Sequence, residues 1–262
     1  MFEPSQFALG TLAGSLVGVS LGLVGGGGSI LAVPLMVFVV GVKDPHIAIG
    51  TSALAVAINA LVGLLNYARA GSVKWRCGFM YGSAGIVGAF AGSTAGKVVD
   101  GQKLLFVFAI MMGVVALLMF RTRRAIGVAG AECNRETAPK VLGYGAGTGV
   151  VSGFFGIGGG FMIVPGLMAS TGMPILNAIG TSLIAVTAFG VTTAVNYAWS
   201  DLINWNICVA LVLGGAAGSF IGMKICHLLS GRSGRLQSVF SLIIFVVALC
   251  LLYKSASTIL RA

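Results

Sequence analysis

The feature that most constrains this chain is an internal duplication of its sequence. Residues 22–36 read GLVGGGGSILAVPLM, and residues 153–167 read GFFGIGGGFMIVPGL. The two stretches align at their glycine runs and again at Pro34 and Pro165, which lie 131 residues apart. A glycine run inside almost continuous apolar sequence is unusual, and here it occurs twice.

Two further matches follow in the same order. IAIGTSALAV (47–56) matches NAIGTSLIAV (177–186), and LLNYARAGSVKW (64–75) matches AVNYAWSDLINW (194–205). The offset from the GTS motif onward is 130 residues, one less than at the prolines. Three matches in the same order at nearly one spacing are strong evidence of a duplication.

The composition places the chain in a membrane. Hydrophobic residues make up 57% of the sequence and charged residues only 8%, and the mean hydropathy is +1.03. Soluble domains carry about 25% charged residues, so this chain cannot cover a globule with polar surface. The long unbroken apolar runs favour helices over a β-barrel. The N-terminal MFEPSQFALG has no basic region, so we expect no cleaved secretory signal.

Each half is predicted to contain five apolar segments. They are 6–24, 29–41, 45–67, 76–97 and 103–120 in the first half, and 140–156, 160–172, 175–199, 205–228 and 236–254 in the second. The second segment of each half is too short for a membrane core of about 30 Å, so we expect a half-helix that begins at the glycine loop. The predicted fold is an all-α integral membrane protein with a first repeat (1–122), a cytoplasmic linker (123–139) and a second repeat (140–262).

The net charge of +10 is interpreted as a set of topology signals rather than a nucleic-acid surface. Basic residues crowd the loop at 68–76, the linker and the loop at 229–235, which the positive-inside rule assigns to the cytoplasm. This pattern requires an odd number of crossings per half, so the repeats are inverted and both termini lie outside. Either the first two segments form a re-entrant hairpin or all five cross, and the sequence does not choose between these models.

The glycine loops are candidate binding elements. Non-helical backbone is tolerated at membrane depth only inside protein or beside a wet cavity. Glycine lets a ligand reach the main chain, and successive N–H groups at a helix start bind anions. The predicted contributors are Gly27, Gly28 and Ser29 in the first copy and Gly158, Gly159 and Gly160 in the second. Pro34 and Pro165 are possible hinges.

The duplicated GTS motif follows the same logic. Thr51, Ser52, Thr181 and Ser182 are predicted to open helices as N-caps, and to surround one small anion with hydroxyl groups from both repeats. The alternative is that these hydroxyls only cap the helix or bond back to it. Asn66-Tyr67 and Asn196-Tyr197 lie at predicted helix ends, where a role in the site and a role as interfacial aromatic anchors are equally supported. The G-x-x-x-G runs at 88–96 and 214–222 are predicted to be packing seams.

Several functions lack the residues that they need. All six acidic residues fall in loops or at segment ends, which disfavours a carboxylate proton relay and a cation site. The five scattered cysteines suggest neither a zinc site nor a disulfide framework. His46 and His227 have no catalytic neighbours in the sequence, so we expect no enzyme activity and no cofactor.

The paired glycine-proline and GTS motifs resemble those of the TauE/SafE family, also called the sulfite exporter or TSUP family. The resemblance spans both halves. It implies transport of sulfite, sulfoacetate or related small sulfur-containing anions across the bacterial inner membrane, with the loops at 25–34 and 156–165 and the two GTS motifs as the matching positions. The first loop has Ser29 where the second has Gly160, which leaves open whether both loops contribute equally.

The predicted function is therefore a secondary carrier of a small oxyanion that works by alternating access. A channel-like facilitator is the first alternative, and a membrane-embedded enzyme is a distant second. The sequence leaves open the exact substrate, the direction of transport, the coupling ion and the oligomeric state.

Overall fold

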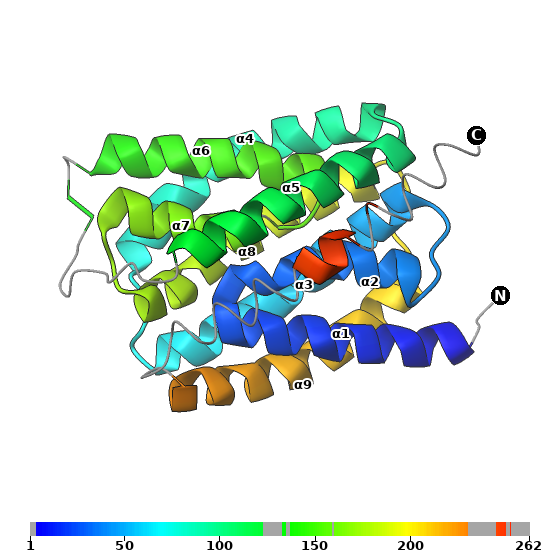
Figure 1. Cartoon of the computed structure of the whole chain (residues 1–262), viewed down its shortest axis with the longest axis horizontal. Coiled ribbons are helices and arrows are strands. Elements are labelled where there is room, and N and C mark those ends of the chain that lie inside the picture. The colour runs from blue at the N-terminus through cyan, green and yellow to red at the C-terminus, as the bar shows by residue number, and fades with distance from the viewer. Residues whose placement is uncertain are drawn as a thin grey trace.

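A computed structural model of the chain describes residues 4–122, 133–134, 137–158, 160–229, 245–249 and 252. These residues form helices and connecting turns without any strand (Figure 1). The first repeat contains α1 (Pro4–Val24), the 3₁₀ helix η1 (Gly25–Leu31), α2 (Ala32–Phe38), α3 (Pro45–Arg69), α4 (Trp75–Val98) and α5 (Gly101–Thr122). The second contains α6 (Ala138–Phe155), α7 (Gly160–Thr171), α8 (Ile175–Ala198) and α9 (Trp205–Leu229). The predicted segment 236–254 lies mostly outside the described residues.

The helices agree closely with the predicted apolar segments because local signals delimit them. Asp44 accepts a hydrogen bond from the His46 N–H and Pro45 occupies the first turn, so α3 begins there. Pro174 directly precedes α8 without a side-chain cap, and Gly156 ends α6 with a positive φ of 64°. The predicted all-α fold is confirmed.

Among the described residues, four helices are long and apolar enough to cross a membrane. They are Ser5–Val24, Pro45–Arg69, Ile175–Ala198 and Trp205–Cys226. Ser29–Phe38 and Met162–Thr171 are shorter apolar helices, as expected for the second segment of each repeat. The inverted orientation of the repeats in a membrane remains a prediction.

The two repeats interlock rather than form separate bodies. α3 and α8 pack against each other in the middle, α1 lies along α9 on one side, and α4 lies along α6 on the other (Figure 1). In the duplicated sequence α1 corresponds to α6, and α4 corresponds to α9. The first helix of each repeat therefore packs against the fourth helix of the other, and the two contacts are equivalent.

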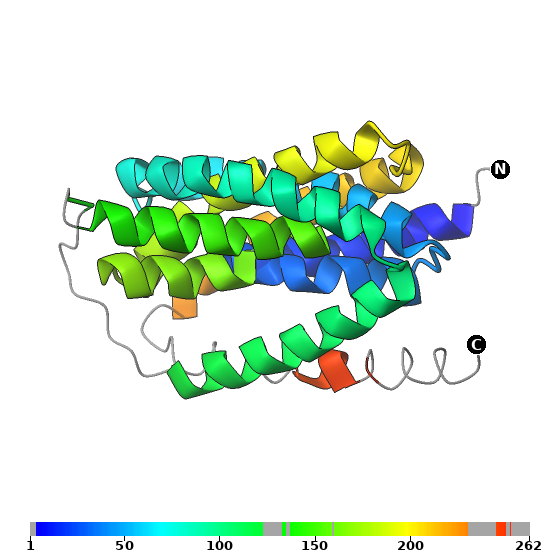
Figure 2. The same cartoon turned by 90° about the horizontal axis from the view of Figure 1, so that it is seen from above.

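Glycines allow these outer helix pairs to approach closely. A Cβ atom on Gly18 would overlap the backbone of Gly215, and one on Gly149 would overlap the backbone of Gly85. The predicted G-x-x-x-G seams are confirmed, because residues 88, 92 and 96 of α4 face α6 and residues 214, 218 and 222 of α9 face α1. Figure 2 shows α5 crossing the other helices at an angle. Leu104, Phe108 and Met112 attach it to a buried cluster that also contains Ile30.

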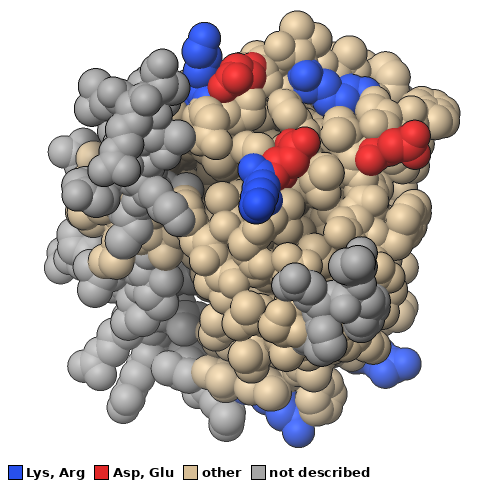
Figure 3. Space-filling model, turned by 90° about the vertical axis from the view of Figure 1, so that its right-hand side faces the viewer, with Lys and Arg blue, Asp and Glu red and all other residues tan. Residues whose placement is uncertain are grey.

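Charge divides the molecule into two ends. Red carboxylates and blue basic residues gather on one face of the molecule (Figure 3). The described carboxylates are Asp44 before α3, Asp100 before α5 and Asp201 before α9, and all are exposed. We call the end that carries them the aspartate end. The opposite end is called the basic end, and its described charged residues are Arg69, Lys74, Arg76, Lys140 and Lys224. No described carboxylate lies there. This separation is what the positive-inside rule leads us to expect if the basic end faces the cytoplasm.

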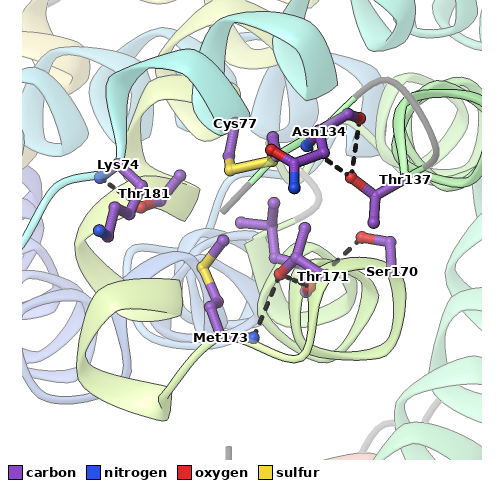
Figure 4. The surroundings of a disulfide bond; sticks show 10 residues. Lys74, Cys77, Asn134, Thr137, Ser170, Thr171, Met173 and Thr181 are labelled. Carbon is purple, nitrogen blue, oxygen red and sulfur yellow. Dashed lines mark hydrogen bonds between the residues drawn. A yellow bond between two sulfur atoms is a disulfide. The ribbon is translucent and has the colours of Figure 1, made fainter. Parts of the chain in front are cut away.

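A disulfide at the basic end was not expected from the sequence. Cys77 in the first turn of α4 is bonded to Cys133 in the segment between the repeats (Figure 4). The interpretation that the cysteine spacings suggest no disulfide is therefore wrong for this pair. The two cysteines are 56 positions apart in the sequence, so their spacing alone does not predict the disulfide. Cys208 and Cys226 are free and buried.

Candidate functional site

The second glycine loop reaches the centre of the molecule. Gly158 has a φ of 66°, and a Cβ atom there would lie 3.3 Å from Cγ1 of both Val56 and Val186. These valines occupy equivalent positions in α3 and α8, so Gly158 lies where the duplicated helices cross. The helix that follows, α7, packs against η1 of the first repeat. The glycine segments of the two repeats, in η1 and in the loop before α7, are thus brought together near the crossing of α3 and α8.

Each glycine segment begins against the other repeat. Gly25, with a φ of 66°, packs against Ile179, whose carbonyl oxygen would lie 2.9 Å from an added Cβ. Gly156, with a φ of 64°, packs against Ile49 in the equivalent way. Ile49 and Ile179 directly precede the two GTS motifs. Positive φ and this close approach explain why both positions are glycine.

The remaining predicted loop residues are placed as follows. Gly27 and Gly28 lie in η1, so the first loop is a 3₁₀ helix rather than an irregular segment. Ser29 is fully buried. Gly160 begins α7. Gly159 lies outside the described residues.

The GTS hydroxyl groups are not helix caps. α3 begins at Pro45 and α8 at Ile175, so each motif lies in the second turn of its helix, and the predicted capping role is wrong. All four side chains are fully buried. Ser52 Oγ donates to the Ile49 carbonyl at 3.0 Å, and Ser182 Oγ donates to the Ile179 carbonyl at 2.7 Å.

The threonines connect the repeats with one symmetric pair of hydrogen bonds. Thr51 Oγ1 accepts from the Asn204 N–H at 2.9 Å. Thr181 Oγ1 accepts from the Lys74 N–H, also at 2.9 Å (Figure 4). Asn204 and Lys74 occupy equivalent positions just before α9 and α4. The GTS motif of each repeat therefore holds the loop that precedes the fourth helix of the other repeat.

The structure does not bring the two GTS motifs together. Gly50 packs against Tyr197, and Gly180 packs against Tyr67, so α3 and α8 run antiparallel. The stretch of α8 from Thr181 to Tyr197 is about 24 Å long at 1.5 Å per residue. One motif therefore lies toward the aspartate end and the other toward the basic end. The arrangement is two equivalent clusters, each made of one repeat's glycine segment and the other repeat's GTS motif, which we call half-sites.

The Asn-Tyr pairs are also buried rather than interfacial. Tyr67 and Tyr197 are both fully inaccessible to solvent. The Tyr67 hydroxyl donates to the Gly22 carbonyl at 2.7 Å, three residues before the first glycine segment. Asn196 lies beside Lys97, whose Nζ donates to the Asn196 side chain at 2.8 Å and to Ser200 Oγ at 3.1 Å.

Sequence reasoning missed several polar residues within the apolar helices. Asn59, Ser152 and Thr193 are buried, and each has a side-chain oxygen without a hydrogen-bond partner. Polar residues inside membrane-spanning segments are functional candidates by default, and this signal was present in the sequence. In the part of the chain that the structure describes, no three His, Cys, Asp or Glu residues are placed to hold a metal ion.

Comparison with known proteins agrees with the resemblance found from the sequence motifs. The family model described as sulfite exporter TauE/SafE matches residues 10–251. A probable membrane transporter protein of Xylella fastidiosa (strain Temecula1 / ATCC 700964) is 46% identical over 249 residues, which cover 93% of this chain and 94% of that protein. The probable membrane transporter protein YdhB of Bacillus subtilis (strain 168) is 27% identical over 218 residues, covering 82% and 88%. No solved structure matches the chain.

Proposed function

The chain belongs to the TauE/SafE sulfite exporter family of membrane transporters, and we propose that it moves a small sulfur-containing oxyanion, such as sulfite or sulfoacetate, across the bacterial inner membrane by alternating access. The observation that carries this proposal is the exchange of partners between repeats: Gly25 packs against Ile179, and Gly156 packs against Ile49. Equivalent half-sites at opposite ends of one crossing suit a carrier that opens to each side in turn.

The half-site toward the basic end combines Gly27, Gly28 and Ser29 with Thr181 and Ser182. The half-site toward the aspartate end combines Gly158 and Gly160 with Thr51 and Ser52, and Gly159, between the two glycines in the sequence, stays a predicted contributor. Main-chain N–H groups and the hydroxyl hydrogens of Thr51 and Thr181 bind an oxyanion without a fixed counter-charge. Ser52 and Ser182 donate to the Ile49 and Ile179 carbonyls, so they contribute only when those hydrogen bonds are released. Because Gly158 lies where α3 and α8 cross, we propose that an anion moving between the half-sites passes its backbone, which no side chain of its own covers.

The prolines of the short helices provide a place for movement. Pro165 lies inside α7, and Pro34 lies in the first turn of α2, which follows directly on η1. Pro165 removes one backbone hydrogen bond from the interior of α7 and weakens the helix there, and Pro34 lies at the junction between η1 and α2. We propose that tilting of α2 and α7 about these residues opens one half-site while the other closes.

A channel-like facilitator is the second candidate. The observation that favours it is that the described carboxylates, Asp44, Asp100 and Asp201, are all exposed at the aspartate end, so none of them lies beside the crossing to couple a proton. Interlocked repeats with a central crossing still favour a carrier.

Transport by purified protein in liposomes tests both ideas. We expect sulfite to enter the vesicles in a protein-dependent way under anaerobic conditions, and an internal load of unlabelled sulfite to accelerate uptake of ³⁵S-sulfite. This counterflow requires a carrier. Uptake without counterflow would support the facilitator, and no uptake of sulfite, sulfoacetate or thiosulfate would refute the proposed function.

A further inference from the structure

Three buried hydroxyl groups beside the second glycine segment have no hydrogen-bond partner. They are Ser152 Oγ, Thr193 Oγ1 and the Tyr197 hydroxyl. Ser152 is 1% exposed, and the other two side chains are fully buried. Buried polar atoms in proteins are nearly always paired, so three unpaired hydroxyls in one region call for a partner that the protein does not supply.

These groups come from two helices that pack together, α6 and α8. Ser152 lies one turn before Gly156, and its carbonyl oxygen accepts from the Ile157 N–H at 3.3 Å. Thr193 and Tyr197 are four residues apart, so they share one face of α8. Tyr197 belongs to the same buried cluster as Phe155 and Ile157, the two residues that flank Gly156.

His46 adds a fourth unpaired polar atom in the same region. Its Nδ1 is buried without a hydrogen-bond partner, and its ring centroid lies 6.5 Å from that of Tyr197. Lys97 Nζ lies 6.0 Å from the Tyr197 ring centroid and donates only to neutral oxygens. The positive charge is therefore not balanced by any described carboxylate, which makes this region attractive to an anion.

The equivalent region of the other half-site is different. The positions that correspond to Ser152, Thr193 and His46 are occupied by Leu21, Gly63 and Leu176. The counterpart of Tyr197 is Tyr67, whose hydroxyl is already bonded to the Gly22 carbonyl. At these four pairs of equivalent positions, the described residues therefore place unpaired hydroxyl groups on the side of the second glycine segment and none on the other side.

We propose that Ser152, Thr193 and Tyr197 form an oxyanion-binding site beside the second glycine segment, displaced from the crossing toward the aspartate end. This inference rests on the proposed function and specifies where its substrate binds. A sulfite or sulfonate oxygen accepts hydrogen bonds from the three hydroxyl groups, and the unpaired charge of Lys97 favours the anion over a neutral molecule. The half-site toward the basic end holds the same anion more weakly.

The matched pair Tyr197→Phe and Tyr67→Phe tests the site. Both changes remove one buried tyrosine hydroxyl from equivalent positions. We expect Tyr197→Phe to weaken sulfite binding by about 10- to 100-fold, the effect of losing one hydrogen bond to an anion. Its melting temperature without anion should equal or exceed that of the wild type, because no hydrogen bond in the protein is lost. Tyr67→Phe should lower the melting temperature and leave the sulfite affinity within about twofold.

Isothermal titration of the purified protein with sulfite, under anaerobic conditions, measures the affinity. If the wild type binds sulfite and Tyr197→Phe binds it equally well, the site is rejected while the proposed function stands. If the wild type binds neither sulfite nor sulfoacetate, both fail. If Tyr197→Phe does not fold, Ser152→Ala and Thr193→Val provide the same comparison, and unchanged affinity in both rejects the site.

Discussion

At the scale of single residues, the threonines of the GTS motifs have a structural task that is separate from ligand binding. Each accepts the N–H of a loop residue that immediately precedes a long helix, Asn204 for Thr51 and Lys74 for Thr181. Both threonines are fully buried. Loss of either oxygen leaves a backbone N–H without an acceptor in an apolar environment, which lowers the free energy of unfolding.

Thr51→Val and Thr181→Val are therefore expected to destabilise the protein by about 1–3 kcal/mol each. Thr51→Ser and Thr181→Ser keep the acceptor oxygen and should destabilise the protein less than the valine variants do. Unfolding of the purified protein in detergent measures the difference. Valine variants as stable as their serine counterparts would show that these hydrogen bonds contribute nothing to the fold.

Lys97 is a second residue with a definite expected effect. Its Nζ donates to the Asn196 carbonyl, the Asn196 side chain and Ser200 Oγ, so it joins the end of α4 to the end of α8. We expect Lys97→Met to reduce the initial rate of sulfite uptake, and to do so most at low ionic strength, where electrostatic attraction is least screened.

Lys103→Met is the matched control, because Lys103 is exposed near Asp100 at the same end of the molecule. Its uptake rate should stay near that of the wild type. Equal effects of the two substitutions at every salt concentration would mean that Lys97 acts only through general surface charge.

At the scale of helices, close packing of α1 on α9 and of α4 on α6 depends on glycines at the contact. Such packing replaces the hydrophobic effect, which does not drive helices together within lipid. Gly149 faces the backbone of Gly85, whereas Gly147 on the same helix has no atom within 4 Å of an added Cβ.

This pair gives a controlled test of the seam. Gly149→Ala should destabilise the protein markedly, since the methyl group would overlap the backbone of α4. Gly147→Ala should be neutral or stabilising by up to about 1 kcal/mol, because alanine favours a helix. Thermal unfolding in one detergent measures both, and equal melting temperatures would mean that α4 and α6 do not pack as described.

At the scale of the whole molecule, two observations assign the basic end to opposite compartments. Its charge indicates the cytoplasm. Its Cys77–Cys133 disulfide is more typical of an oxidising compartment. We expect the charge to decide, because orientation is set during insertion, before a disulfide forms. Cys77 and Cys133 are then expected to be thiols in the cell and to form a disulfide in purified, oxidised protein.

Labelling of intact cells with a membrane-impermeant maleimide tests this orientation. In a background with serine at positions 77 and 133, Lys43→Cys at the aspartate end should be labelled and Arg69→Cys at the basic end should be protected. The reverse pattern would assign the basic end to the outside and the disulfide to the cell's oxidising side.

The sequence by itself determined the features that depend on local patterns. The helix limits followed from apolar runs bounded by proline, aspartate and glycine, as at Pro45 and Gly156. The short second segment of each repeat followed from the distance between the glycine run and the next polar loop. The duplication and the family followed from matched motifs, which need no knowledge of how the helices pack.

Only the tertiary structure decided which equivalent residues meet. Because α3 and α8 run antiparallel, the two GTS motifs lie at opposite ends of the crossing, and each meets the other repeat's glycine segment at Ile49 or Ile179. The duplicated sequence makes Tyr67 and Tyr197 look alike, yet only Tyr67 finds an acceptor in the protein. Hydrogen bonding of a buried hydroxyl depends on neighbours that are far away in the sequence, and no local pattern contains them.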